Sequence, residues 1–98
     1  MTCEAIVEIL RRHQGPLMAR GVTHLGLFGS AARGDSKPES DIDVVVDIAD
    51  PSDFSLVDHA SLRVFLRDIL GKETDVVVAA HLAPGFRNRV ASERVEVF

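Results

Sequence analysis

The sequence is poor in cysteine and in long apolar runs, and both scarcities exclude classes of protein. Its single cysteine, Cys3, excludes a framework of internal disulfides. No apolar run approaches the length of a membrane-spanning helix, and Glu4 and Glu8 lie where a signal peptide needs an uncharged core. These features predict a cytoplasmic protein that does not associate with membranes.

Basic residues are also in deficit. Eleven lysines and arginines stand against 15 aspartates and glutamates, which gives a formal net charge of −4. Because proteins that bind nucleic acids mainly through the phosphate backbone are usually basic, this balance argues against direct binding of DNA or RNA. The hydrophobic fraction of 46% and the charged fraction of 27% are close to those of globular proteins, so residues 1–98 are expected to form one domain.

The hydrophobic pattern predicts a mixture of helices and strands. A helix is expected after Thr2, and Ser55 and Asp58 form a capping box before the most regular helical pattern, which ends at Gly71. Strands are predicted over residues 22–28, 41–48, 73–79 and 95–98, short helical segments over 16–20, 30–34 and 84–92, and a bend at Lys37-Pro38. This order predicts an α/β (α+β) domain with a small mixed β-sheet backed by helices.

The segment LFGSAARGDSKPESDIDVVVD, residues 27–47, concentrates the unusual features of the chain. Side chains alternate between the two faces of a strand, so Asp41 and Asp43 are expected to project from the same face. The opposite face is apolar and consists of Ile42, Val44, Val46 and Ile48. Two like charges side by side repel each other unless a cation lies between them. The pattern therefore predicts a divalent-metal site.

Two further features support this prediction. The Gly29-Ser30 turn at the end of a predicted strand can offer backbone N–H groups and a hydroxyl to an anion such as phosphate. Asp75 begins the next valine-rich strand, and three carboxylates converge if that strand lies beside residues 41–48. Mg²⁺ prefers a few such oxygen ligands and keeps its other positions for water and substrate phosphates. For Asp75 alone a solvent-facing role is favoured, but together with the Gly-Ser turn the three aspartates favour a metal site.

Three short motifs carry a family resemblance: Gly29-Ser30, Arg33-Gly34 and Ser40-Asp41-x-Asp43. With ten residues between Ser30 and Asp41, they are similar to the signature of the nucleotidyltransferase superfamily typified by DNA polymerase beta. At this length the chain resembles the minimal nucleotidyltransferases, the MntA-type antitoxins that are paired with HEPN-domain toxins. The resemblance covers almost the whole chain and implies the nucleotidyltransferase fold.

Carried over residue by residue, the resemblance implies that Asp41 and Asp43 ligate two Mg²⁺ ions, and that Asp75 completes the catalytic metal site and helps to deprotonate the acceptor hydroxyl. It also implies that Gly29 and Ser30 hold the phosphates of ATP. The implied activity is transfer of AMP to a tyrosine of a cognate HEPN ribonuclease toxin, with release of pyrophosphate. Two alternatives stay open: an antitoxin that neutralises its toxin by binding alone, and a transferase that acts on a small molecule or an RNA end.

Several other polar residues have no single interpretation. Arg33 either contacts phosphate, as part of the nucleotide site, or braces its loop by pairing with Asp35 or a strand carboxylate. Asp47 shares the face of the two metal-site aspartates but lies further along the strand, and it is expected to be solvated. His81 follows the third strand, where it lies either near the site or on the surface, and the surface position is favoured.

The C-terminal segment is rich in arginine. Arg87, Arg89 and Arg94 are expected to form a solvated or partner-facing side of the molecule. Phe86 lies among them, and it is expected either to anchor an interface or to pack into the core.

Overall fold

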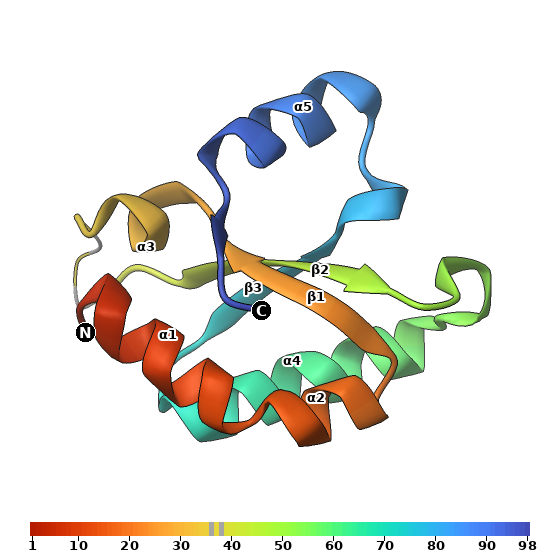
Figure 1. Ribbon diagram of the computed structural model, residues 1–98, viewed down its shortest axis with the longest axis horizontal. Helices are drawn as coiled ribbons and strands as arrows, with labels where there is room; N and C mark the ends of the chain where they lie inside the picture. The colour runs from red at the N-terminus through yellow and green to blue at the C-terminus, as the bar shows by residue number, and fades with distance from the viewer. Residues whose placement is uncertain (36, 38) are drawn as a thin grey trace.

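The computed structural model describes residues 1–35, 37 and 39–98, and in these residues helices lie on both faces of a four-stranded sheet (Figure 1). The helices are α1 (Cys3–Arg12), α2 (Gln14–Ala19), α3 (Gly29–Arg33), α4 (Leu56–Leu70) and α5 (Pro84–Glu93). The strands are β1 (Val22–Leu27), β2 (Ile42–Ile48), β3 (Thr74–Val78) and β4 (Val95–Glu96), and single 3₁₀ turns cover Pro51–Asp53 and Ala79–His81.

The sheet is mixed, as the sequence predicts. Its strands lie in the order β3-β2-β1-β4. β2 and β3 run parallel, whereas β1 is antiparallel to both β2 and β4. The predicted strand over residues 95–98 is shorter in the structure, where β4 contains two residues. Beyond it, the Val97 N–H still donates to the Leu25 carbonyl at 2.8 Å, so contact with β1 continues without regular strand pairing. Of the helices that the structure describes, none is long and apolar enough to cross a membrane.

The predicted helix ends are confirmed at the long helices. The Thr2 side chain accepts a hydrogen bond from the Ala5 N–H at 3.1 Å at the start of α1. Ser55 and Asp58 form the reciprocal capping box that opens α4, and Gly71 ends that helix with a φ of 70°. The bend predicted at Lys37-Pro38 is not assessed, because Pro38 lies outside the described residues.

α2 begins at Gln14, two residues before the predicted helical segment. The Leu17 N–H donates to the His13 carbonyl at 3.0 Å, so the helical turn already includes Gly15 and Pro16. Proline is tolerated there because the first turn of a helix needs no intrahelical N–H donor.

The two sides of β2 pack against different sets of helices, and this arrangement positions the site. Its apolar face contributes Ile42, Val44, Val46 and Ile48 to the main core. That core also contains Leu10 of α1 and Leu62 and Leu66 of α4. On the other face, Val45 packs with Phe28 and with Val90 of α5 in a smaller cluster. Asp43 shares the face of Val45, so it projects toward the α5 side of the sheet.

Candidate active site

The centre of the candidate site is a pair of aspartates on neighbouring parallel strands. Asp43 of β2 is the direct ladder partner of Asp75 of β3. Side chains of ladder partners project from the same face, and adjacent strands lie roughly 4.8 Å apart. Asp41 lies just before β2, on the same side by the two-residue alternation. The structure thus confirms that segment 73–79 lies beside segment 41–48, as the convergence of the three carboxylates requires.

The charge at this point is unbalanced. Partial burial raises the pKa of Asp43, and the negative charges of Asp75 and then Asp41 raise it further, whereas the Arg33 guanidinium opposes the shift. Within residues 1–35, 37 and 39–98, no three His, Cys, Asp or Glu side chains are gathered closely enough to form a ready-made metal cage. Asp41, Asp43 and Asp75 thus repel one another on one side of the sheet without forming a closed cage. Their carboxylate oxygens are hard donors of the kind that suits a divalent cation such as Mg²⁺, which would leave its other positions to water and phosphate oxygens.

The Gly-Ser turn lies directly against Asp43. Gly29 has a φ of +63°, and a Cβ built on it would lie 2.5 Å from Asp43 Oδ2. Only glycine adopts this conformation and leaves this space without strain. The Phe28 N–H donates to the Asp43 carbonyl at 3.1 Å, which fastens the end of β1 to β2. Ser30 follows Gly29 in the first turn of α3, one residue from this contact with Asp43.

Arg33 is the basic residue whose charge opposes the raised pKa of Asp43. Its ion pairs fit the alternative in which it braces its loop. Its Nε pairs with Asp35 Oδ2 at 3.3 Å, and its Nη1 lies 3.9 Å from Glu93 Oε1 at the end of α5. The side chain is more than half exposed. Sequence reasoning missed the contact with Glu93, which joins α3 to α5.

The predicted solvation of Arg94 is wrong. Its side chain is 15% exposed and pairs with Asp47 at 3.1 Å and with Glu96 at 3.0 Å. It lies across Gly26 of β1, where a Cβ would come within 2.5 Å of Arg94 Nε. Asp47 is accordingly ion-paired, although its side chain is still 41% exposed. A glycine inside a predicted strand is the sequence signal that could have indicated this close approach.

Three other predictions are also decided. His81 is exposed, and its ring nitrogen lies 3.2 Å from the Pro51 carbonyl, at the opposite end of β3 from Asp75. Arg87 is exposed but hydrogen-bonds to the carbonyls that precede α5. Phe86 is 37% exposed and lies under the Arg89 guanidinium, so it is not a core residue.

Comparisons with known proteins agree with this fold. Residues 3–97 match the family model described as nucleotidyltransferase domain. The chain is 37% identical over 98 residues to the protein adenylyltransferase MntA of Thermococcus cleftensis, covering 99% of this chain and 97% of the relative. A solved structure classed provisionally as a minimal nucleotidyltransferase superposes with a TM-score of 0.81 at 31% identity, covering 97% of this chain and 95% of the other.

A more distant structure adds support for the fold. It is described as a tri-AMPylated HEPN toxin of Shewanella oneidensis in complex with an MNT antitoxin. The matched chain has a TM-score of 0.69 and 18% identity, and the match covers 94% of this chain and 71% of that one.

Proposed function

Because the chain belongs to the nucleotidyltransferase domain family, we propose that it transfers AMP from ATP to a tyrosine hydroxyl of a cognate HEPN-domain toxin and so acts as the antitoxin. The family and the relatives named as protein adenylyltransferases support an enzyme that uses a nucleotide substrate. The AMPylated HEPN toxin in the distant structural relative supports the choice of AMP and of a protein acceptor.

A single observation carries the proposal for the site. Asp43 and Asp75 lie side by side on parallel strands, and Gly29 of the Gly-Ser turn is packed against the carboxylate of Asp43. A chain that only needed to fold gains nothing from this arrangement, because it places like charges together. The arrangement does suit a nucleoside triphosphate, whose phosphates need cations on one side and hydrogen-bond donors on the other.

Each residue then has a role. Asp41 and Asp43 would hold two Mg²⁺ ions, with Asp75 completing the site nearer the acceptor. Bound there, Mg²⁺ supplies charge neutralisation at the phosphate oxygens and acidifies the attacking hydroxyl. The backbone N–H of Gly29 and the hydroxyl of Ser30 would orient the β- and γ-phosphates.

The transfer is a direct displacement. The tyrosine oxygen of the acceptor attacks the α-phosphorus, and the bond from this phosphorus to the bridging oxygen breaks, so that pyrophosphate leaves. Asp75, which is exposed beside the half-buried Asp43, takes up the phenolic proton. Orientation of the two reactants provides much of the rate enhancement, and no covalent enzyme intermediate is required.

The test measures the intact mass of the HEPN partner after incubation with this protein, ATP and Mg²⁺. The expected result is a gain of one or more AMP units that is lost with Asp43→Asn. Asp68→Asn is the matched control, because Asp68 is an exposed aspartate on α4, at the opposite face of the sheet. A toxin that is neutralised by a stable complex but gains no mass would refute the transfer and favour inhibition by binding alone.

A further inference from the structure

Asp41 is held differently from the other two carboxylates of the candidate site. Asp43 and Asp75 are ladder partners inside the sheet, whereas Asp41 is exposed and lies just before Ile42, the first residue of β2. The ladder therefore fixes two of the carboxylates, but the position of Asp41 depends on the segment that enters β2. Groups that orient metal ligands influence the affinity for the metal nearly as much as the ligands do.

The segment that enters β2 is attached to the start of β3 by two hydrogen bonds, one on each side of Asp41. After Asp41, the Ile42 N–H donates to the Glu73 carbonyl at 3.0 Å. Before Asp41, the Lys72 ammonium donates to the Lys37 carbonyl at 3.0 Å, and these two residues are 35 positions apart in the chain. The start of β3 thus holds the chain both upstream and downstream of Asp41.

The Lys37 carbonyl connects Lys72 to Asp41. It accepts a second hydrogen bond at 3.0 Å from the N–H of Ser40, the residue directly before Asp41. Lys72 is half-buried, although a lysine ammonium is strongly hydrated and its long side chain loses rotamer freedom when it is fixed. Its contact with the Lys37 carbonyl therefore restrains the peptide that leads into Asp41.

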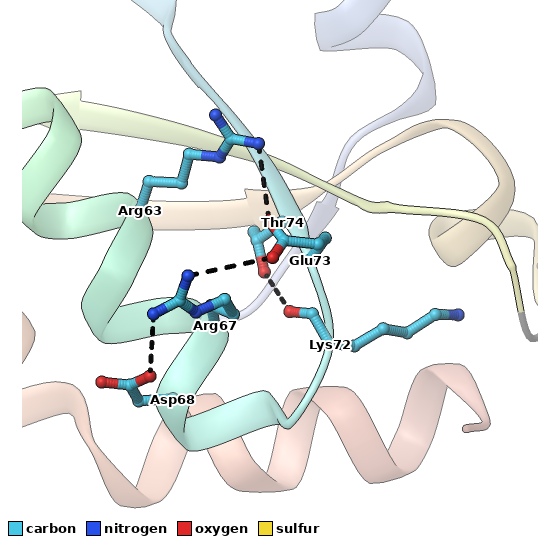
Figure 2. Close-up of polar contacts among 6 residues, drawn as sticks. All are labelled: Arg63, Arg67, Asp68, Lys72, Glu73 and Thr74. Atoms are coloured by element: carbon cyan, nitrogen blue, oxygen red, sulfur yellow. Dashed lines mark hydrogen bonds and ion pairs between the residues drawn. The ribbon is translucent and has the colours of Figure 1, made fainter.

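The start of β3, from which Lys72 reaches this peptide, is itself well anchored (Figure 2). Thr74 is fully buried, and its hydroxyl donates to the Lys72 carbonyl at 3.2 Å. Glu73 pairs with Arg63 and Arg67 of α4 at 3.5 and 3.9 Å. In Figure 2 the Lys72 side chain extends away from both arginines. Two independent contacts thus fix the backbone on which Lys72 is mounted.

We propose that Lys72 is a positioning residue of the metal site. Its hydrogen bond to the Lys37 carbonyl holds Asp41 where this carboxylate joins Asp43 and Asp75 around a divalent cation. The importance of Lys72 for the reaction rests on the proposed nucleotidyl transfer, but its effect on metal binding is measured without ATP or toxin. The two proposals can therefore fail separately.

Positioning and charge predict opposite effects of removing the Lys72 ammonium. A positive charge near a cation site opposes cation binding, so loss of the charge alone would strengthen the binding of a divalent metal. Loss of the hydrogen bond releases the segment that carries Asp41 and weakens binding. The sign of the change therefore distinguishes the two effects.

Titration of the full chain with Mn²⁺, followed by electron paramagnetic resonance, measures this sign, because carboxylates bind Mn²⁺ as they bind Mg²⁺. Lys72→Met should raise the Mn²⁺ dissociation constant by about threefold to tenfold. Lys37→Met is the matched control: it removes a charge at the other end of the contact but keeps the backbone carbonyl, so binding should be unchanged or tighter. Lys72→Arg keeps a donor and the charge, and it should restore most of the affinity.

Transfer kinetics separate positioning from a general loss of structure. In Lys72→Met, the Mg²⁺ concentration for half-maximal transfer to the toxin should rise by about the same factor as the Mn²⁺ dissociation constant, whereas the rate at saturating Mg²⁺ should stay within about twofold of the wild type. A damaged fold would instead lower the rate at every Mg²⁺ concentration.

The outcomes that would overturn the proposal are specific. Unchanged or tighter Mn²⁺ binding in Lys72→Met, equal weakening in Lys72→Met and Lys37→Met, or a wild type that binds no Mn²⁺ would each do so. Mn²⁺ binding that follows the expectations without any gain in toxin mass would instead refute the proposed transfer and leave the positioning role of Lys72 intact.

Discussion

Replacing Asp43 by asparagine is expected to stabilise the fold when no divalent cation is present. The carboxylate of Asp43 lies beside that of Asp75 on the adjacent strand, with Asp41 nearby. For two charges about 5 Å apart, Coulomb's law gives roughly 0.8 kcal/mol in bulk water and about 3 kcal/mol at an effective dielectric constant of 20. Because the site is partly open to solvent, we expect a gain of about 1 kcal/mol at low ionic strength.

The pH dependence of this effect has a definite sign. The pKa of Asp43 is raised above its ordinary value of 3.8. A folded state that binds this proton more tightly than the unfolded state loses stability as the pH rises through the raised pKa. The loss of folding stability caused by ionised Asp43 is therefore fully present at neutral pH, and it disappears as the pH falls toward 3.8. Below this value the wild type and Asp43→Asn should be equally stable.

Urea denaturation in low-salt buffer with a chelator measures this difference, and for a domain of this size 1 kcal/mol corresponds to about 4–8 °C in Tm. Saturating Mn²⁺ with a non-hydrolysable ATP analogue should raise the Tm of the wild type and reverse the order of the two proteins. Asp68→Asn, on the opposite side of the sheet, controls for a general loss of negative charge. An Asp43→Asn protein that is less stable than the wild type at pH 8 without metal would refute the repulsion argument.

Three further substitutions test the packing around the site. Gly29→Ala should lose nucleotidyl transfer and about 1–2 kcal/mol of stability, measured by toxin mass and urea denaturation, because its φ is +63° and its Cβ would lie 2.5 Å from Asp43 Oδ2. Wild-type activity in this variant would contradict the close approach. Gly26→Ala should lower the free energy of unfolding by about 1–3 kcal/mol, because the added Cβ displaces Arg94. The double variant Gly26→Ala/Arg94→Ala should lose less stability than the sum of the two single variants, and simple additivity would contradict the contact. Ser55→Ala should lower the free energy of unfolding by about 1 kcal/mol, because it removes the N-terminal cap of α4. An unchanged midpoint of urea denaturation would show that the cap contributes nothing to stability.

Local features of the site were predictable from the sequence because they depend on residues close together in the chain. The two-residue alternation placed Asp41 and Asp43 opposite the apolar face of β2, and the structure has Ile42 and Val44 in the main core. The start and end of α4 followed from a capping box and a glycine within its own sequence. The spacing of the Gly-Ser turn and the aspartates was likewise sufficient to indicate the family.

The interactions that sequence reasoning missed join distant parts of the chain. Arg94 was expected on a solvated or partner-facing side, but it fills the space above Gly26 and pairs with Asp47. Arg33 reaches Glu93 at the end of α5. Nothing in the local sequence of either arginine shows which strand or helix passes beside it, since the neighbours are determined by strand order and by the path of the connections.

The sequence by itself determined most of the elements and their apolar faces, because these depend on spacings of two to four residues. Its motifs also indicated the residues of the proposed chemistry, through their resemblance to a known family. Only the tertiary structure decided that Asp43 and Asp75 are ladder partners and that Gly29 packs against Asp43. It also decided that the Val57–Val64 side of α4 faces solvent while the Leu62–Leu66 side is buried. The physical reason is that register and burial depend on the whole sheet and the layers on both of its faces, which no short segment of the chain specifies.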